Sequence, residues 1–276
     1  MQHITSRHNP IVARFRDAAK RSTPPYLTTL LEGPRLIEEA LAASVTLELA
    51  AVGSAPTTDD RWSPLLRRLG RATEVVRVSA PVMAALSPVA TPSGLVAIAT
   101  PTPAQFESTV RASQPLVLGL VGVQDPGNTG AVIRAAEAGG ATGVVTVAGA
   151  DPYGWKALRG AMGSTLRFPV VCTNDPDGIK AKARARGLRL LAAVPHGGTP
   201  TTEADLTSPC LIWLGAEGGG LSAPVMDDAD ELISVPMRPP VESLNIAVAS
   251  ALIIYEAARQ RADRTASTTA VRGRPA

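Results

Sequence analysis

The sequence is poor in aromatic residues, in cysteine and in long apolar runs, and each shortage excludes a class of protein. Aromatic side chains make up 3% of the 276 residues, so aliphatic side chains must fill most of any core. The two cysteines, Cys172 and Cys210, lack metal-ligand spacing and predict a disulfide-free chain that buries both thiols. No apolar run approaches the roughly 18 residues that cross a bilayer. The first residues also lack a hydrophobic signal core, which predicts a cytoplasmic protein.

Acidic residues are scarce in two segments of a chain whose net charge is +3. Residues 178–202 contain five basic side chains and no acid. Residues 1–22 contain Asp17 as their one acid, against the basic side chains Arg7, Arg14, Arg16, Lys20 and Arg21. Such clusters are candidate contacts for nucleic-acid phosphates, and the alternative is a solvated helix face.

Apolar runs alternate with helical patterns along the whole chain, which predicts an α/β fold with a largely parallel sheet. The run over 116–123 is continuously apolar, as is typical of a strand that is covered on both faces. Further strands are expected over 28–31, 45–52, 75–78, 95–99, 143–148, 188–194, 210–214 and 232–235. Helices are expected from Pro34 and over 62–69, 129–139, 177–186 and 243–261.

The segment Thr100-Pro101-Thr102-Pro103 interrupts both helix and strand patterns and marks a domain boundary. We expect a small α/β domain over residues 1–105, a linker over 106–114 and a second domain over 115–262. A surface loop within one domain is the alternative reading of the boundary. The composition after Arg261 predicts a disordered tail over 263–276.

Three segments stand out, because each follows a predicted strand and ligands gather at the carboxyl ends of parallel strands. The first runs from Asp125 to Arg134. Its glycines permit a sharp turn, and Asn128 or Thr129 can cap the following helix. Arg134 lies within that helix, where it can reach an anion near the helix start. A capped turn with a surface arginine is the alternative.

The second segment is Leu214-Gly215-Ala216-Glu217-Gly218-Gly219-Gly220. Glycines after a buried strand allow the backbone to approach a ligand closely, although a purely structural turn would look the same. The segment is neither a P-loop nor G-x-G-x-x-G, which argues against a Rossmann-type nucleotide-binding enzyme. We expect Glu217 to accept backbone N–H groups or to lie beside Arg134.

The third segment runs from Ile233 to Met237 and continues with Glu242-Ser243-Leu244-Asn245. Ser243 is suited to cap the last helix. Asn245 is expected in the first turn of that helix, where its amide gains most by bonding to a group outside the helix.

Together the three segments resemble the motifs of the SpoU, or TrmH-like, branch of the SPOUT RNA methyltransferases. Asn128-Thr129-Gly130-x-x-x-Arg134 resembles the first motif, Leu214 to Gly220 the second, and Ile233-x-Val235-Pro236-Met237 with Ser243-Leu244-Asn245 the third. Order and spacing agree over residues 116–261. Glu32 to Ala40 also resembles the small substrate-binding domain that many members carry.

The resemblance implies a parallel sheet with a C-terminal trefoil knot, a homodimer, and S-adenosylmethionine as cofactor, with no metal. It implies ribose 2′-O-methylation of ribosomal RNA or tRNA, and the additional N-terminal domain favours ribosomal RNA of the 23S type. A non-catalytic RNA-binding protein with the same fold is the alternative. The implied catalytic residues are Arg134, Asn128, Glu217, Ser243 and Asn245. The implied cofactor-binding residues are Gly215, Val235, Leu244, Leu214 and Met237.

Arg134 is the arginine that the family resemblance makes catalytic. A guanidinium rarely gives up its proton, so a role as general base is chemically difficult. We therefore expect Arg134 to clamp an RNA phosphate and to stabilise the developing alkoxide. RNA contacts are expected from Arg134 and from the basic residues of the first segment.

Overall fold

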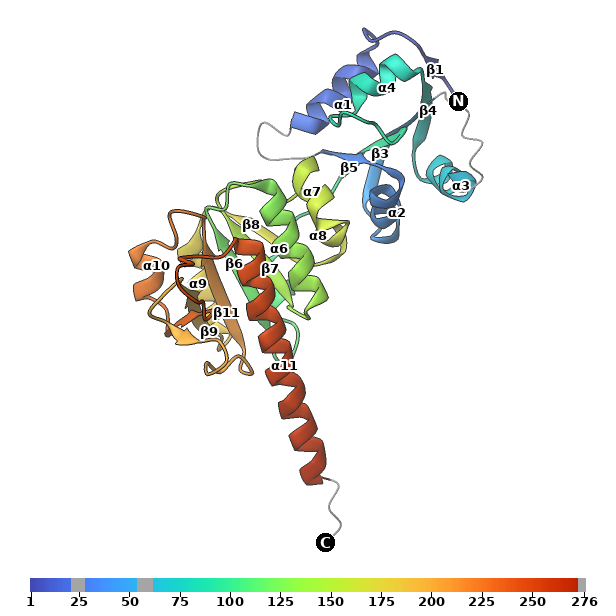
Figure 1. Cartoon of the computed structure of the whole chain (residues 1–276). Coiled ribbons are helices and arrows are strands. Elements are labelled where there is room, and N and C mark those ends of the chain that lie inside the picture. The colour runs from blue at the N-terminus through green and yellow to red at the C-terminus, as the bar shows by residue number, and fades with distance from the viewer. Residues whose placement is uncertain (21–27, 54–61, 273–276) are drawn as a thin grey trace. The chain divides into compact units, whose positions relative to one another are not determined.

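The computed structural model describes residues 1–20, 28–53 and 62–272, which form two compact units (Figure 1). Unit 1 comprises Met1–Thr102 together with Tyr153–Arg167, and unit 2 comprises Pro103–Pro152 with Phe168–Ala276. The chain therefore enters unit 2, returns to unit 1 and enters unit 2 again. We expected each domain to be one continuous stretch of chain, and that division did not assign residues 153–167 to the first domain.

Unit 1 is built on a mixed five-stranded sheet with helices on both faces. The sheet has the order β1-β4-β3-β5-β2, and β5 runs antiparallel to both of its neighbours. Its strands are β1 (His3–Ile4), β2 (Thr29–Glu32), β3 (Thr46–Gly53), β4 (Glu74–Val78) and β5 (Leu95–Thr100). The helices are α1 (Pro10–Lys20), α2 (Pro34–Ala42), α3 (Ser63–Ala72) and α4 (Ala80–Leu86). One core contains Phe15 of α1 and Val82 of α4, and a second contains Ile37 of α2 and Leu69 of α3.

Helices α7 (Trp155–Ala161) and α8 (Ser164–Arg167) complete unit 1 although they come late in the sequence. Leu158 is fully buried in the same core as Ile37. The Thr29 hydroxyl donates a 2.6 Å hydrogen bond to the Tyr153 carbonyl, and Arg167 pairs with Glu39 at 2.7 Å. Unit 1 thus takes part of its core from a segment between two strands of unit 2.

Unit 2 is built on a seven-stranded sheet in the order β10-β12-β9-β11-β6-β7-β8. Every described pair in it is parallel, so the expected parallel sheet is confirmed. The strands are β6 (Leu116–Val121), β7 (Gly143–Val147), β8 (Val170–Thr173), β9 (Arg189–Ala193), β10 (Thr199–Pro200), β11 (Cys210–Gly215) and β12 (Glu231–Ser234). Gly119 of β6 is required because the ring of buried Trp213 on β11 fills the space of a Cβ.

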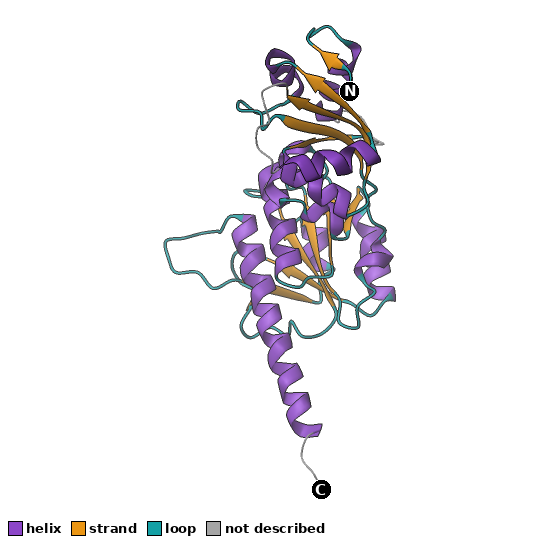
Figure 2. Cartoon of the chain, turned by 90° about the vertical axis from the view of Figure 1, so that its right-hand side faces the viewer, coloured by secondary structure: helices purple, strands orange, loops and turns teal. Residues whose placement is uncertain are grey.

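The helices of unit 2 are α5 (Phe106–Thr109), α6 (Pro126–Ala138), α9 (Pro176–Ala185), α10 (Ala223–Asp227) and α11 (Ile246–Arg272). Helix α11 packs along α6, and its last turns extend past the sheet of unit 2 (Figures 1 and 2). The contact is close, because the Ile254 side chain occupies the space that a Cβ on Gly139 would take.

Three local expectations are wrong. Residues 106–114 are not a free linker, because Phe106 of α5 and Val110, which follows the helix, are buried in the core of unit 2. The C-terminal tail does not begin at residue 263, because α11 continues to Arg272. Cys172 is exposed rather than buried, since it faces outward from the edge strand β8, whereas Cys210 is buried as expected.

Candidate active site

The three motif segments meet at the carboxyl edge of the parallel sheet of unit 2. Strands β6 and β11 pair in register as far as Val121 and Gly215, so the loops that follow them begin side by side. The segment after β12 returns to this edge, where α11 begins at Ile246. Parallel strands bring these loops together because all of their carboxyl ends point the same way.

Glu217 is the centre of a hydrogen-bond network that joins all three segments. Its Oε1 accepts from Nδ2 of Asn128 at 3.0 Å and from Nδ2 of Asn245 at 2.8 Å. The same oxygen accepts from the backbone N–H of Ile246 at 3.4 Å. Asn245 Nδ2 also donates to Oδ1 of Asn128 at 3.1 Å. Residues that lie up to 117 positions apart in the sequence are therefore held together by two amides and one carboxylate.

Asn245 uses both ends of its side-chain amide. While Nδ2 donates to Glu217 and Asn128, Oδ1 accepts the backbone N–H of Ala247 at 2.9 Å, which makes Asn245 the cap of α11. The expected cap, Ser243, is exposed and lies before the helix. The expectation that Ser243 caps α11 was wrong. Asn245 caps the helix and also bonds to Glu217, which Ser243 does not do.

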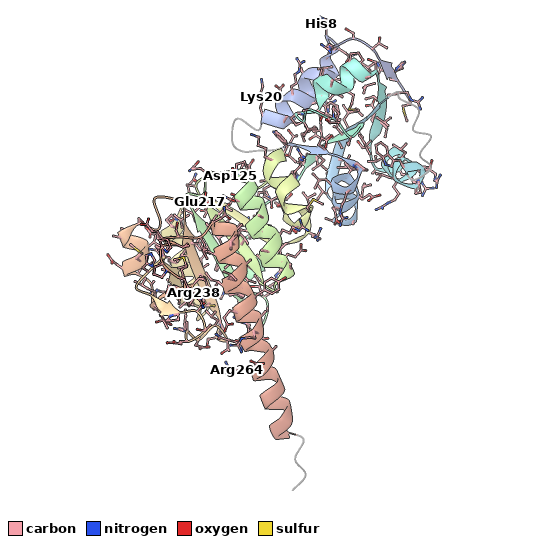
Figure 3. All side chains as sticks on the ribbon, viewed as in Figure 1. His8, Lys20, Asp125, Glu217, Arg238 and Arg264 are labelled. Atoms are coloured by element: carbon pink, nitrogen blue, oxygen red, sulfur yellow. The ribbon has the colours of Figure 1, made fainter. Side chains whose placement is uncertain are left out.

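The start of α6 is fixed by Asp125. Its Oδ1 accepts the backbone N–H of Asn128 at 2.7 Å, and Pro126 occupies the first helical position. Asp125 is labelled in Figure 3. Asn128 and Thr129, the two expected caps, lie inside α6, because the helix begins three residues before the expected start at residue 129. Aspartate followed by proline is itself a helix-start signal, and it was available in the sequence. The earlier cap frees the Asn128 side chain for Glu217.

Gly215 is required by the fold of the loop that contains Glu217. A Cβ at this position would overlap the main chain of Gly220 and Leu221. Ala216 and Gly220 form an isolated bridge there, and the N–H of Gly220 donates to the carbonyl of Ala216 at 2.9 Å. The glycine thus lets the loop fold back on itself and sets the position of Glu217.

Arg134 is exposed on α6, and Glu217 does not contact it. Within residues 1–20, 28–53 and 62–272, no hydrogen bond or ion pair to its guanidinium is found. Of the two alternatives expected for Glu217, the structure shows the first, because its carboxylate accepts the backbone N–H of Ile246, and not a position beside Arg134. Asn128 and Glu217 together hold Asn245 and the start of α11, which leaves the charge of Arg134 available.

The expected cofactor-binding residues lie on two segments of the same edge. Leu214 is buried at the end of β11, and Gly215 follows it half-buried. Val235, Met237 and Leu244 are half-buried in the segment between β12 and α11. The structure thus brings these residues to the edge where the Glu217 network lies.

The two basic segments differ in how their charges are matched. In the N-terminal segment, Arg7 and Arg16 donate to the carbonyls of Pro81 and Ala85, and Arg14 lies 3.6 Å from Glu48. Lys20 is exposed at the end of α1 (Figure 3), and Arg21 lies outside the described residues.

In the second segment, carboxylates neutralise most of the charge. Lys180 pairs with Asp177 and Asp228, and these contacts raise the pKa of Lys180. Arg184 pairs with Asp230 at 3.0 Å, and Lys182 lies 3.4 Å from Glu107. Arg189 pairs with Glu231 at 2.6 Å. This cluster stabilises unit 2 rather than presenting free charge.

Cys210 is the first residue of β11, at the opposite end of the strand from the loop that contains Glu217. Burial raises the pKa of Cys210 to about 11, so its thiol stays protonated at neutral pH. The described residues contain no group of three His, Cys, Asp or Glu side chains arranged to hold a metal ion. None of their helices is long and apolar enough to cross a membrane.

Comparison with known proteins gives the family. Residues 115–255 match the model of the SpoU rRNA Methylase family, and residues 20–97 match an MRM3-like substrate binding domain. The chain is 34% identical over 262 residues to an uncharacterized tRNA/rRNA methyltransferase of Synechocystis, and the match covers 94% of each protein. The chain belongs to the SpoU rRNA methylase family. The family assignment made from the three motifs is confirmed.

Two further similarities bear on the site. The chain is 30% identical to the 23S rRNA (guanosine(2553)-2′-O)-methyltransferase RlmP of Bacillus subtilis, over 92% of this chain and 98% of that protein. Its structure resembles that of the SpoU methyltransferase AviRb from Streptomyces viridochromogenes in complex with AdoMet. The TM-score is 0.83 at 26% identity, over 91% of this chain and 98% of that one. The expected enzyme class, an S-adenosylmethionine-dependent RNA 2′-O-methyltransferase, is confirmed.

Proposed function

We propose that this enzyme methylates a ribose 2′-hydroxyl of 23S ribosomal RNA at the carboxyl edge of the unit 2 sheet. The observation that carries the proposal is the Glu217 network, which joins the three SpoU motifs into one site. Similarity to RlmP over nearly the whole chain favours 23S rRNA over tRNA as substrate. The match of residues 20–97 to a substrate binding domain supports a role for unit 1 in RNA capture. Such a substrate implies a cytoplasmic enzyme.

The residues at the edge fit S-adenosylmethionine. Half-buried Val235, Met237 and Leu244 offer apolar cover for an adenine ring. A Cβ at Gly218, Gly219 or Gly220 would meet no atom, so there is open space beside the loop backbone. We assign Leu214, Gly215 and these three apolar residues to cofactor binding. When bound, the cofactor would supply a methyl group on a sulfonium, whose sulfur leaves as a neutral thioether.

The chain's own groups then position the RNA. We assign Arg134 to a phosphate next to the target ribose, where its planar fork makes two parallel hydrogen bonds and stabilises negative charge that develops on the 2′-oxygen. Asn128, Glu217 and Asn245 hold the two loops and the start of α11 in place. Ser243 is exposed on the segment before α11 and is assigned to the ribose. Arg7, Arg14, Arg16, Lys20 and Arg21 are assigned to phosphates farther from the target.

The connection from β12 to α11 supports the trefoil knot that the family resemblance implies. Strand β12 lies next to the edge of the sheet, whereas α11 packs on α6, which connects β6 and β7. The connecting segment must cross the sheet edge, and its end binds Glu217 of the loop after β11. We propose that the segment is threaded through that loop.

Helix α11 also carries the surface that we propose for homodimer formation. Val248, Leu252 and Tyr255 are spaced along one stripe of the helix and are 49%, 47% and 57% exposed. Ile254, on the same helix, is fully buried within the chain and is not part of this surface. Light scattering at micromolar concentration should give the mass of a dimer, and Leu252→Asp should give a monomer with unchanged far-UV circular dichroism.

The proposed function is tested by mapping 2′-O-methyl groups in a strain that lacks the gene. One 23S rRNA position should lose its methyl group, and the wild-type gene should restore it while Arg134→Ala should not. Loss of a tRNA methyl group with intact 23S rRNA would overturn the choice of substrate. Unchanged methylation of both RNAs would overturn the enzymatic proposal as a whole.

A further inference from the structure

Unit 1 contains a cavity of about 600 Å³ that the catalytic site does not use. One wall is formed by the end of β2 and the start of α2, from Glu32 to Leu36. The other wall is formed by α7 and the residue that follows it, from Trp155 to Met162. All of these residues belong to unit 1, and the volume lies in the range of cavities that hold small ligands.

The cavity wall presents positive charge that none of the described carboxylates pairs with. Arg35, Lys156 and Arg159 are exposed lining residues. In the part of the chain that the structure describes, none of the three forms an ion pair or a side-chain hydrogen bond. Glu32 is the carboxylate of the lining, and its Oε1 accepts hydrogen bonds from the Ser93 backbone N–H at 2.9 Å and the Ser87 hydroxyl at 3.4 Å.

An aromatic side chain lies in the same wall. Trp155 is half-buried, packs partly against the core that contains Phe15, and lines the cavity. The Lys156 ammonium lies 5.6 Å from the centre of its ring. Gly33, which precedes α2, offers no side-chain acceptor to the first N–H groups of that helix, and it too lines the cavity. The wall thus combines an aromatic face, three cations and helix N–H donors.

We propose that this cavity binds one unpaired nucleotide of the RNA substrate, with its base stacked against Trp155 and its phosphates held by Arg35 and Arg159. The inference rests on the proposed function, because it takes the substrate to be RNA. Bases of single strands expose their faces for stacking on aromatic rings, whereas the bases of a duplex do not. An acidic peptide would use the cations but would leave the aromatic face and the volume unused.

Binding of a model RNA to the full-length protein tests the proposal. The probe is a single-stranded oligouridylate of about twelve nucleotides, within the site sizes of single-strand binders. Its affinity is compared with that of the same strand paired with oligoadenylate. The variants are Trp155→Phe, Trp155→Ala and Arg159→Gln, and Arg71→Gln on the exposed face of α3 is the matched control. Trp213 is fully buried in unit 2 and Trp62 packs against the core that contains Ile37, so comparison with Trp155→Phe isolates the fluorescence change that comes from Trp155.

We expect the single strand to bind more tightly than the duplex and to quench tryptophan fluorescence. Trp155→Ala should weaken binding by about tenfold, as loss of one stacked base does. Trp155→Phe should keep the affinity but lose the quench. Arg159→Gln should lower the salt dependence of binding by roughly 0.7 in log–log slope, the value for one phosphate contact on a single strand. The Arg71 control should match the wild type.

Equal affinity of Trp155→Ala and wild type, with matching thermal unfolding midpoints, would overturn the nucleotide pocket. If Trp155→Ala is unstable, two other results test the pocket. These are the loss of fluorescence quenching in Trp155→Phe and the smaller salt dependence of RNA binding in Arg159→Gln. Equal binding of an aspartate-rich peptide to the wild type and to both Trp155 variants, with no RNA effect, would assign the cations to protein contact. Rescue of 23S methylation by Trp155→Ala with a normal Michaelis constant would reject the pocket but leave the proposed function intact. Oligouridylate binding that depends on Trp155, together with no methylation in cells, would support the pocket but reject the proposed function.

Discussion

Units 1 and 2 both contain clusters of basic residues, but carboxylates pair with these residues in only one of the two clusters compared. On α9 of unit 2 and beside it, Lys180, Arg184 and Arg189 each face a carboxylate. In the cavity of unit 1, Arg35, Lys156 and Arg159 have no such partner among the described residues. A count of basic residues favours the α9 segment as the RNA contact. The ion pairs favour the cavity instead, because they neutralise the charges near α9 and leave those of the cavity available. The comparison supports the proposal that unit 1 captures RNA, while unit 2 carries the proposed catalytic site.

The division between the units is tested most strongly at Leu158. This residue lies within the SpoU match, yet its side chain is fully buried in the core of unit 1. Leu158→Ala should therefore destabilise unit 1 by about 2–5 kcal/mol, as expected for a large-to-small change in a core. Urea unfolding, followed by amide exchange in each unit, measures the effect. Exposed Val241→Ala, in the segment between β12 and α11, is the control, with an expected change within about 0.5 kcal/mol. Equal loss of protection in both units would argue that they unfold as one body.

Arg134 tests whether the chemistry belongs to unit 2. Arg134→Lys keeps the positive charge but loses the planar fork, so the turnover rate should fall by about 10²-fold or more, as when an oxyanion contact is removed. S-adenosylmethionine affinity should be unchanged, because a cationic sulfonium gains nothing from a nearby cation. The wild-type and variant rates should rise in parallel with pH. A variant profile displaced to lower pH, with methyl transfer shown to be rate-limiting, would restore arginine as the base.

Glu217 is a positioning residue, and its substitution separates charge from hydrogen bonding. Glu217→Ala removes the acceptor shared by Asn128, Asn245 and Ile246, and the rate should fall by about tenfold. Glu217→Gln retains a carbonyl oxygen at this place and should recover most of the rate. The affinity for oligouridylate should be the same in both variants, because that binding is assigned to unit 1. A glutamine variant as slow as the alanine variant would mean that the negative charge itself is needed.

The smallest expected effect concerns Glu256 on α11. Hydrogen bonds from Arg259 and Gln260 lower the pKa of this carboxyl from its ordinary value of 4.5 to about 2. A depressed folded-state pKa contributes stability above about pH 4.5, which is lost as the pH falls toward 2. Thermal melts of wild type and Glu256→Gln should therefore differ near neutral pH and converge in acid. A difference that persists at pH 2 would show that packing, not ionisation, accounts for it.

The sequence by itself determined the alternation of elements, the parallel sheet of unit 2 and the three motif segments. These features are local, because the spacing of apolar residues and the positions of turn residues can be recognised in short stretches of the chain. The family could be identified for the same reason, since Asn128, Glu217 and Asn245 lie in compact motifs. The sequence did not reveal how Glu217 bonds, since its partners come from elements far apart along the chain.

Only the tertiary structure decided three further matters. Asn245, not Ser243, caps α11, because its position also lets it bond to Glu217. The segment from Trp155 to Arg167 joins unit 1, because Leu158 packs in the same core as Leu31 and Ile37. The basic residues near α9 are neutralised by acids from residues 205–231. In each case a side chain's role depends on partners distant in sequence, which only the folded chain brings within bonding distance.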